Sequence, residues 1–285
     1  MKHFYLIGNP DKPRTEEVAV KISDYLWSHG ATCHRNHGRP AASDSKHKYT
    51  DADAVPAETE GVIVLGGDGT MIQAARDLAN RQLPLIGINL GTLGYLTQIS
   101  REEDICDMLQ ELLHDHYQLE NRMMFRGTAY RDGELLYEDI ALNEIVITRK
   151  DLLKVVKIAI DVNGEFLNRY TADGIIIATP TGSTAYNLSA GGPVVEPRAR
   201  MTIITPICPH TLNARSIVLS AEDEIRIRIE GNDDRGHVAV FDGDTATELL
   251  VGDEIIVRKS EIETTLIKVR NISFLDNLRN KMSGV

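Results

Sequence analysis

Short apolar runs alternate with helical patterns in the first half of the chain. Residues 4–7, 62–65 and 85–88 are almost wholly apolar and predict buried strands. Residues 15–29, between the first two runs, carry apolar side chains at helical spacing, and residues 105–113, after the third run, place theirs on one face of a helix. Strands that alternate with helices in this way predict βαβ units and a mainly parallel sheet.

The pattern changes after about Tyr117. An Asp-Gly pair at 132–133 and an Asn-Gly pair at 163–164 each lie between two strand-like runs. Such pairs suit tight hairpin turns because Gly and Asn tolerate positive φ. Further strand-like runs follow at short intervals and predict an antiparallel, all-β domain. Residues 274–282 are again helical in pattern, and we expect them to pack back on the first domain.

Two domains accommodate this change of pattern in a chain of 285 residues. We expect an α/β, Rossmann-like N-terminal domain over residues 1–117 and an all-β, sandwich-like domain over residues 118–262. A C-terminal segment, 263–285, follows. The polar stretch 34–48 interrupts the pattern. Its composition favours a surface loop, and the alternative is a flap that closes over anionic phosphates.

The charge balance limits which partners the surface can attract. The chain has 31 Lys and Arg against 42 Asp and Glu, a formal net charge of −11. Such a surface repels nucleic acid and anionic lipid, so we expect neither as a partner. Phosphorylated ligands then need backbone N–H groups, a few cations or a metal ion. We also expect no membrane span, since no run reaches about 18 apolar residues.

Cysteine usage and the N-terminal sequence favour the cytoplasm. Cys33, Cys106 and Cys208 are far apart and odd in number, and they form neither a zinc spacing nor a disulfide framework. A reducing compartment is therefore expected. The first residues have only a brief apolar run that ends in Gly-Asn-Pro, which does not fit a signal peptide.

A glycine-rich loop follows one of the predicted strands. Gly66, Gly67 and Gly69 surround Asp68, and a helix is expected after Thr70. Glycine permits close backbone approach, and a helix N-terminus offers free N–H groups, so the loop predicts a phosphate cradle. It is not a Walker A loop, because the Lys-Ser/Thr pair is missing. The alternative is a plain turn in which Asp68 caps the helix, although an Asp there repels anions unless it holds a metal or takes a proton.

A second segment, Thr179–Pro193, combines hydroxyl side chains, a tyrosine and glycines. Such a segment can hydrogen-bond ribose and amide groups and stack an aromatic ring on a base. The alternative is a capped helix start with Ser183 or Thr184 as N-cap.

Asn143 and Glu144 also interrupt an apolar strand, and Asp173 lies at the mouth of the strand before Thr179. Buried polar groups are costly unless they are satisfied. Taken alone, each of these residues, like His210, is more often a structural hydrogen-bonding residue than a ligand contact.

Together these segments resemble the NAD kinase family. The Gly66–Thr70 loop is shared with the wider superfamily of diacylglycerol kinases and 6-phosphofructokinases. Its combination with Asn143-Glu144, Thr171–Gly174 and Thr179–Pro193 is similar to NAD kinases specifically. Residues 86–97 also resemble the second glycine-rich segment of the family.

The resemblance implies a two-domain enzyme with its active site between the domains. Such enzymes phosphorylate the 2′-hydroxyl of the adenosine ribose of NAD to give NADP. The donor is ATP, or polyphosphate in some members, and the cofactor is a divalent metal, here expected to be Mg²⁺. Members are usually homodimers or homotetramers. Some bacterial members carry Arg where this chain has Thr171, which leaves the choice between NAD and NADH open.

Site residues follow from the same resemblance. Asp68 would be the general base, because phosphoryl transfer needs a proton acceptor on the attacking hydroxyl. The implied nucleotide contacts are Gly66, Gly67, Gly69, Thr70, Asn143, Glu144, Asp173, Thr184, Ala185, Tyr186, Asn187, Leu188 and Ser189, with further contacts from Lys154 and Asp244.

Two other functions compete with this interpretation. A lipid kinase of the diacylglycerol type needs an apolar acceptor pocket, and the hydroxyl-rich residues 179–189 argue against one. A nucleotide sensor without turnover is the alternative outside enzymes, and the intact Asp68 argues against it.

Overall fold

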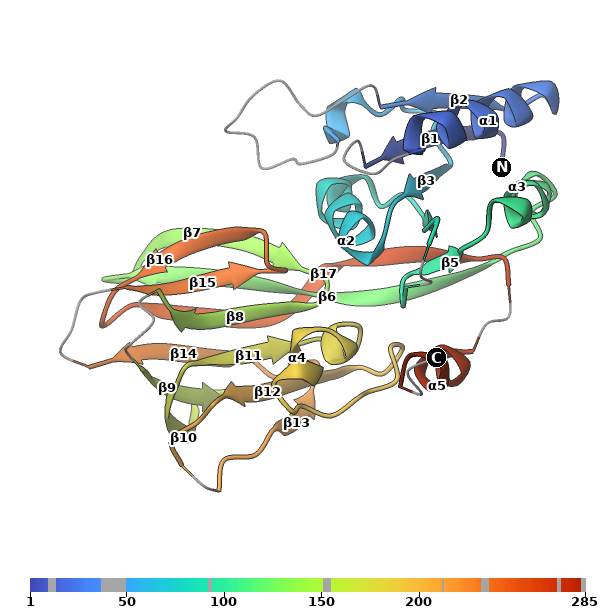
Figure 1. Cartoon of the computed structure of the whole chain (residues 1–285). Helices are drawn as coiled ribbons and strands as arrows, with labels where there is room; N and C mark the ends of the chain where they lie inside the picture. The colour runs from blue at the N-terminus through green and yellow to red at the C-terminus, as the bar shows by residue number, and fades with distance from the viewer. Residues whose placement is uncertain are drawn as a thin grey trace. The chain divides into compact units, whose positions relative to one another are not determined.

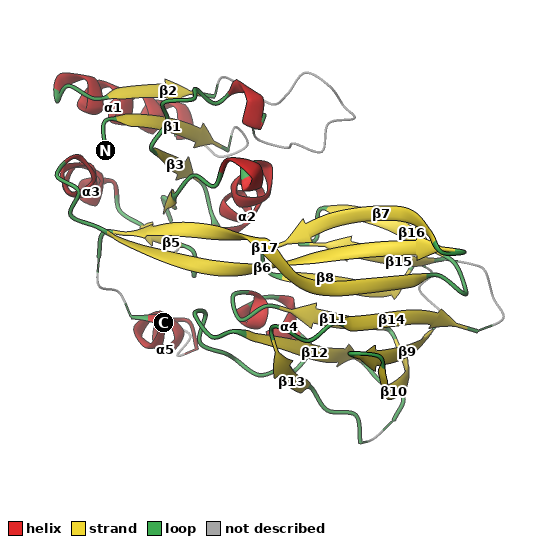
Figure 2. Cartoon of the chain, turned by 180° about the vertical axis from the view of Figure 1, so that it is seen from behind, coloured by secondary structure: helices red, strands yellow, loops and turns green. Residues whose placement is uncertain are grey.

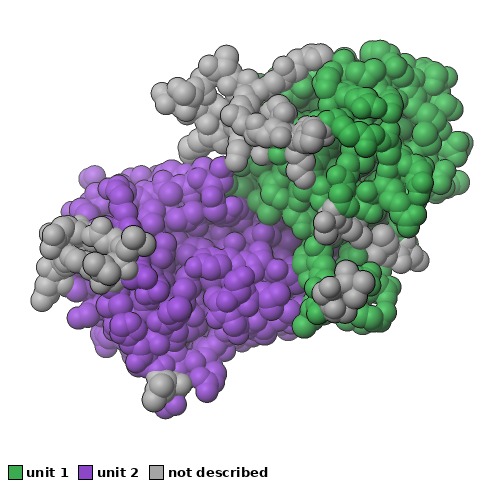
Figure 3. Space-filling view, viewed as in Figure 1, with its two compact units in different colours: residues 1–121, 262–285 green, residues 122–261 purple. Residues whose placement is uncertain are grey.

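The computed structural model forms two compact units (Figure 1, Figure 3). Unit 1 comprises Met1–Asn121 and Ile262–Val285, and unit 2 comprises Arg122–Glu261. The residues that the structure describes are 1–9, 14–36, 50–91, 94–150, 155–211, 213–231, 236–270 and 273–282.

A parallel sheet forms the centre of unit 1. Its strands lie in the order β2-β1-β3-β4-β5, all parallel. The end of strand β17 (Glu254–Lys268) adds to β4, also in parallel, with Leu266 opposite Leu85. The bounds are β1 His3–Gly8, β2 Thr32–Arg35, β3 Gly61–Leu65, β4 Leu85–Ile88 and β5 Thr97–Ile99.

Helices pack against this sheet through apolar faces. The buried side chains of α1 (Thr15–Ser28) recur at Val18, Ile22 and Leu26, which matches the helical period. They share one core cluster with α3 (Ile105–Leu113) and with the strands. The remaining elements of unit 1 are η1 Ala52–Ala54, α2 Asp68–Asp77, η2 Ala79–Arg81, η3 Glu102–Asp104 and α5 Phe274–Met282.

Unit 2 is built from antiparallel strands, and α4 (Tyr186–Ser189) is the α-helix among its described residues (Figure 2). One sheet has the order β13-β12-β11-β8-β15-β16. The other strands follow the order β10-β9-β14-β17, and β6 pairs with both β17 and β7. The bounds are β6 Gln118–Arg131, β7 Glu134–Ala141, β8 Glu144–Arg149, β9 Val156–Val162, β10 Glu165–Ala172, β11 Gly174–Ala178, β12 Met201–Ile207, β13 Ile217–Ser220, β14 Ile225–Glu230, β15 His237–Phe241 and β16 Thr245–Leu249.

Both predicted hairpins are present in unit 2. Asp132 and Gly133 have φ of 51° and 82°, and Asn163 and Gly164 have φ of 52° and 83°. Positive φ at both central residues defines a type I′ turn, the two-residue turn whose backbone twist matches that of the flanking strands. These turns join β6 to β7 and β9 to β10.

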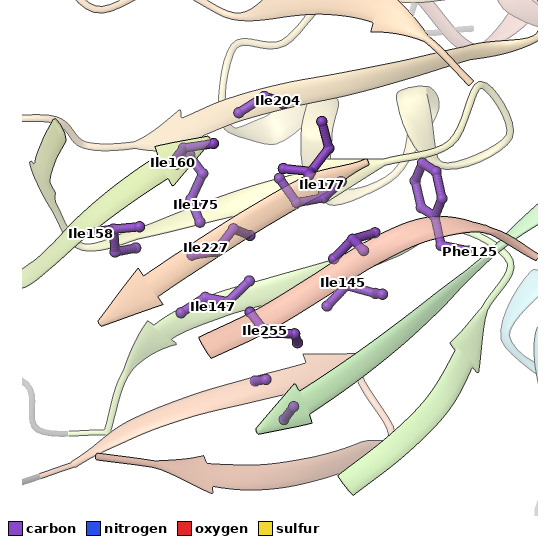
Figure 4. Close-up of a cluster of buried hydrophobic side chains, with 14 of the residues drawn as sticks. Phe125, Ile145, Ile147, Ile158, Ile160, Ile175, Ile177, Ile204, Ile227 and Ile255 are labelled. Carbon is purple, nitrogen blue, oxygen red and sulfur yellow. The ribbon is translucent and has the colours of Figure 1, made fainter. Parts of the chain in front are cut away.

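Isoleucines from the six-stranded sheet and from β9, β14 and β17 fill much of the core of unit 2 (Figure 4). Ile145 and Ile147 of β8 are register partners of Ile177 and Ile175 of β11, so their side chains share one face of the sheet. Ile158 and Ile160 of β9, together with Ile227 and Ile255, belong to the same cluster. The fold-class prediction, an α/β domain followed by an antiparallel β domain, is confirmed.

The three cysteines differ in exposure. Cys33 is buried in unit 1, and burial raises the pKa of its thiol. Cys106 of unit 1 and Cys208 of unit 2 are exposed, and all three are free thiols. Within the described residues, none of the helices combines the length and the apolar character that crossing a membrane requires.

Candidate functional site

The glycine-rich loop of unit 1 connects β3 to α2. The helix begins at Asp68, with Gly67 as N-cap, so the expectation that it begins after Thr70 is wrong. Thr70 N–H and Met71 N–H both donate to the Gly67 carbonyl (3.0 and 3.1 Å). The first-turn amides of Asp68 and Gly69 have no acceptor within an α-helix and are suited to an anion.

A second segment of unit 1 holds the Asp68 carboxylate. Tyr95 N–H donates to Asp68 Oδ2 (2.7 Å), and Leu96 N–H donates to Oδ1 (3.0 Å). A Cβ atom on Gly94 would lie 1.9 Å from Asp68 Oδ1, so only glycine fits beside the carboxylate. The alternative of Asp68 as a helix cap is wrong, because α2 has no side-chain cap bond. Residues 94–96 therefore fix the orientation of Asp68.

Tyr95 also connects this segment to the last helix of unit 1. Lys281 Nζ lies 4.8 Å from the centroid of the Tyr95 ring. Burial, and then the nearby Asp68 charge, raise the pKa of the Tyr95 phenol, so this hydroxyl stays protonated at neutral pH.

In unit 2, Asn143 and Glu144 form a sharp corner between β7 and β8. The Asp242 carboxylate accepts N–H bonds from Leu142 (2.7 Å), Asn143 (2.7 Å) and Glu144 (3.1 Å). Thr179 binds the same corner from the carbonyl side: its N–H donates to Asn143 O (2.8 Å) and its Oγ1 to Leu142 O (2.6 Å). Two segments distant in sequence therefore hold the corner.

Glu144 is buried, with 7% of its surface exposed. Its Oε2 atom has no hydrogen-bond partner among the described residues. Burial first, and then the negative charge of Asp242, raise the pKa of the Glu144 carboxyl group to about 8. At neutral pH this group is mainly protonated, and it can donate a hydrogen bond as well as accept one.

The hydroxyl-rich segment separates into an inner and an outer face. Asn187 is fully buried: Nδ2 donates to Ser183 O (3.1 Å) and Pro193 O (3.0 Å), and Oδ1 accepts from Thr205 Oγ1 (2.7 Å). Tyr186 is exposed (44%), as are Leu188 (38%) and Ser189, while Thr184 and Ala185 are half-buried.

The N-cap alternative for this segment is wrong. The N-caps of η4 (Gly182–Thr184) and α4 are Thr181 and Ala185, and neither makes a side-chain cap bond. Ser183 Oγ instead donates to Pro180 O (2.7 Å) and accepts from Val195 N–H (3.0 Å). The polar side chains inside the segment therefore fix the loop, and those outside are available to a ligand.

The remaining implied contacts occupy different environments. Asp173 is half-buried, and Arg149 Nη2 donates to its Oδ2 (2.9 Å). Asp244 is exposed in the turn after β15, where its N–H donates to Phe241 O (3.0 Å). His210 N–H donates to Thr171 O (2.9 Å), and its ring is exposed. Lys154 lies outside the described residues.

Sequence reasoning missed two parts of this arrangement. Asp242 drew no attention, because an Asp-Gly pair after a strand signals only a turn. The amides of Tyr95 and Leu96 were not connected to Asp68, although the glycine-rich composition of residues 86–97 was noted. Both contacts join segments far apart in sequence, which a single sequence does not reveal.

The chain combines a parallel α/β unit with an antiparallel β unit, and its glycine-rich loop lies at the carboxyl end of a strand, where open α/β sheets bind ligands. The model of the ATP-NAD kinase N-terminal domain matches residues 4–117, and that of the ATP-NAD kinase C-terminal domain matches residues 142–269. The chain belongs to the NAD kinase family and is a phosphotransferase.

Full-length relatives and solved structures agree with this assignment. The chain is 45% identical to an NAD kinase of Lachnospira eligens over 294 residues, covering 99% of this chain and 100% of that one. It is 44% identical to an NAD kinase of Agathobacter rectalis over 289 residues, covering 100% and 99%.

Two solved structures share the fold. A yeast NADH kinase complexed with NADH has a TM-score of 0.86 and 25% identity, covering 99% of this chain and 88% of that one. An NAD kinase from Archaeoglobus fulgidus in complex with ATP has a TM-score of 0.78 and 26% identity, covering 100% of both chains.

Proposed function

We propose that this enzyme transfers the γ-phosphoryl group of ATP to the 2′-hydroxyl of the adenosine ribose of NAD, with Asp68 as the general base. The observation that carries the proposal is the fixed carboxylate of Asp68, at the start of a helix whose first-turn amides suit an anion. A carboxylate in such a place repels phosphate unless it takes a proton or holds a metal, and general-base catalysis gives it a use.

In the proposed reaction, the ribose 2′-oxygen attacks the γ-phosphorus of ATP. The new O–P bond forms as the bond from the γ-phosphorus to the β,γ-bridging oxygen breaks, and ADP leaves. Asp68 accepts the proton of the 2′-hydroxyl. Because such transfers depend mainly on positioning and charge neutralisation, the two amides that orient Asp68 support this role.

Gly66, Gly67, Gly69 and Thr70 would line the phosphates. The N–H groups of Gly66 and Thr70 already donate to Ile88 O and Gly67 O, so the first-turn amides, including that of Gly69, would bind the phosphates in the favourable field of the α2 dipole. Mg²⁺, when bound, supplies charge neutralisation on the triphosphate. Groups of three or more His, Cys, Asp or Glu side chains suited to a metal are absent from the described part of the chain. Asp68 fits the usual mode for Mg²⁺, in which one or two carboxylates and substrate phosphates hold the ion.

Unit 2 would bind the dinucleotide. Asn143 and Glu144 offer an amide and a protonated carboxyl group, and Asp173 offers a half-buried carboxylate. In the 184–189 segment, the exposed Tyr186 ring is available to stack on a base, while Asn187 supports the loop from inside. Contacts from Lys154 and Asp244 remain part of the proposal.

We further propose that the enzyme is a cytoplasmic homodimer or homotetramer whose partners are small nucleotides. The net charge of −11 argues against nucleic acid. Sedimentation would give the oligomeric state.

Mass analysis of products tests the function directly. Purified protein with NAD, ATP and Mg²⁺ is expected to yield NADP, and an NAD analogue without the adenosine 2′-hydroxyl is expected to bind without reacting. Folded protein that binds NAD but never gives NADP with ATP or polyphosphate would exclude the proposed reaction. Phosphorylation of the analogue would place the attacking oxygen elsewhere.

A further inference from the structure

We propose that Asp242 is a positioning residue, whose carboxylate holds the backbone of Leu142–Glu144 so that the buried Glu144 carboxyl group is presented to bound NAD. The inference rests on the proposed function of unit 2 as the dinucleotide-binding unit. It concerns a residue to which neither the family resemblance nor the sequence patterns gave a role.

The contacts of Asp242 with the corner are reciprocal. Both carboxylate oxygens are used: Oδ2 accepts from Leu142 N–H, and Oδ1 accepts from Asn143 N–H and Glu144 N–H. In return, Asp242 N–H donates to Glu144 O (3.0 Å). Charge-assisted bonds to backbone N–H groups are among the stronger hydrogen bonds in proteins. One side chain therefore orders three consecutive amides.

The register of the sheet brings these groups together. Asp242 follows β15, whose last residue, Phe241, lies opposite Ile145 of β8. Asp242 has φ of 50°, a left-handed conformation that Asp tolerates better than most residues. The carbonyl groups of the same corner are occupied by Thr179, so both sides of its backbone are fixed. The direction in which the Glu144 side chain leaves the corner is consequently determined.

The second effect of Asp242 is electrostatic. Glu144 is the register partner of Ala178 of β11, and Thr179, which follows Ala178, bonds the neighbouring Asn143 and Leu142. Neither residue carries a charge, whereas Asp242, in the turn after β15, does. Arg122 Nη1 donates to Thr181 Oγ1 (3.4 Å), and the shift in the pKa of Glu144 comes from burial and Asp242 rather than from Arg122. With burial, the Asp242 charge favours the protonated carboxyl group, leaving one O–H donor for an uncharged acceptor on the ligand.

The test measures NAD binding by calorimetry between pH 6.5 and pH 9 in the full chain. If binding needs the proton on Glu144, the parent Kd is level below about pH 8 and rises about tenfold per pH unit above it. In Asp242→Asn, one acceptor oxygen becomes an NH₂ group that opposes a backbone N–H. We therefore expect the Kd for NAD at pH 7 to rise about tenfold. In this variant the Kd should also begin to rise with pH at a lower pH than in the parent, because losing the Asp242 charge lowers the pKa of Glu144.

Two further variants separate the electrostatic effect from the positional one. Glu144→Gln imitates the protonated carboxyl group, so its Kd should stay near the parent value at pH 7 and should not rise with pH. Asp242→Glu keeps the charge but displaces the carboxylate by one methylene. It should weaken NAD binding at pH 7 about tenfold, while the Kd begins to rise near the same pH as in the parent. This variant also serves if Asp242→Asn does not fold.

Asp253 provides the matched control. It is a buried aspartate of unit 2 (2% exposed) that accepts from Leu250 N–H (2.7 Å) and pairs with Arg131 (3.0 and 2.7 Å), away from the corner. Asp253→Asn is expected to lower the melting temperature while leaving the Kd for NAD and its pH dependence unchanged.

Three outcomes would overturn the proposal. They are an unchanged Kd and pH profile in the Asp242 variants, an equal change in Asp253→Asn, and a parent that does not bind NAD. A parent that binds NAD without making NADP contradicts the proposed reaction instead, and the role of Asp242 is still decided from the Kd values.

Discussion

Gly94→Ala tests whether residues 94–96 set the catalytic geometry of Asp68. The new Cβ atom would lie 1.9 Å from Asp68 Oδ1, and real contacts of this kind are essentially never under 3.0 Å. The carboxylate must move by about 1 Å, or residues 94–96 must withdraw by as much. A misplacement of about 1 Å at reacting groups can lower a rate about 100-fold, so we expect kcat to fall by about that factor.

The assay is initial-rate formation of NADP under saturating ATP and NAD, together with thermal unfolding. KM for NAD should change little, because the substitution lies in unit 1 and the proposed dinucleotide contacts lie in unit 2. Gly30→Ala is the control. Gly30 has φ of 74° and no neighbour within 4 Å of a built Cβ, so alanine should cost about 1–2 kcal/mol of stability without changing kcat. A Gly94→Ala enzyme with kcat within a few-fold of the parent would refute the reasoning.

Four further substitutions have distinct expected results. Asp68→Asn should lower kcat by about 10²–10⁴-fold while NAD binding persists, since it removes the proton acceptor; near-parental turnover would exclude Asp68 from the mechanism. Tyr186→Ala should raise KM for NAD about tenfold with little change in kcat, because stacking is worth about 1–3 kcal/mol per base; an unchanged KM would assign Tyr186 a structural role. Asn187→Ala should lower the free energy of unfolding by about 3 kcal/mol, measured by heat or denaturant, because it leaves the buried partners of three hydrogen bonds unsatisfied; a loss below about 0.5 kcal/mol would contradict this. The raised pKa of Glu144 makes the parent lose stability as pH rises from the ordinary carboxyl pKa of 4.5 toward about 8, because the folded state holds the proton more tightly; Glu144→Gln should flatten this fall in stability, and an unchanged slope would contradict the raised pKa.

Most of the fold could be predicted from short-range sequence patterns. The alternation of strands and helices predicted the parallel sheet of unit 1, and two dipeptides located both hairpins. The start of α2 was misplaced, because Gly69 and Thr70 are weak helix formers. In the folded chain, the first turn includes them nonetheless.

The site was harder to predict than the fold, because its geometry depends on long-range contacts. Glu144 could be selected from sequence as a polar residue in an apolar strand, but its protonation depends on burial and on Asp242, about a hundred positions away. Asn187 lies in the implied binding run, yet its amide faces inward toward Thr205, which a four-residue helix cannot reveal by periodicity. The implied roles of these residues remain predictions until substitutions are measured.

The exposure of the cysteines makes the unmodified chain suitable for spectroscopic labelling. Cys106 and Cys208 are accessible and lie one in each unit, whereas burial protects Cys33 and disfavours its reactive thiolate. A maleimide dye or nitroxide should therefore attach at two positions without any engineered cysteine. Energy transfer or dipolar coupling between the two labels would report the separation of the units in solution and any change in it on adding ATP or NAD.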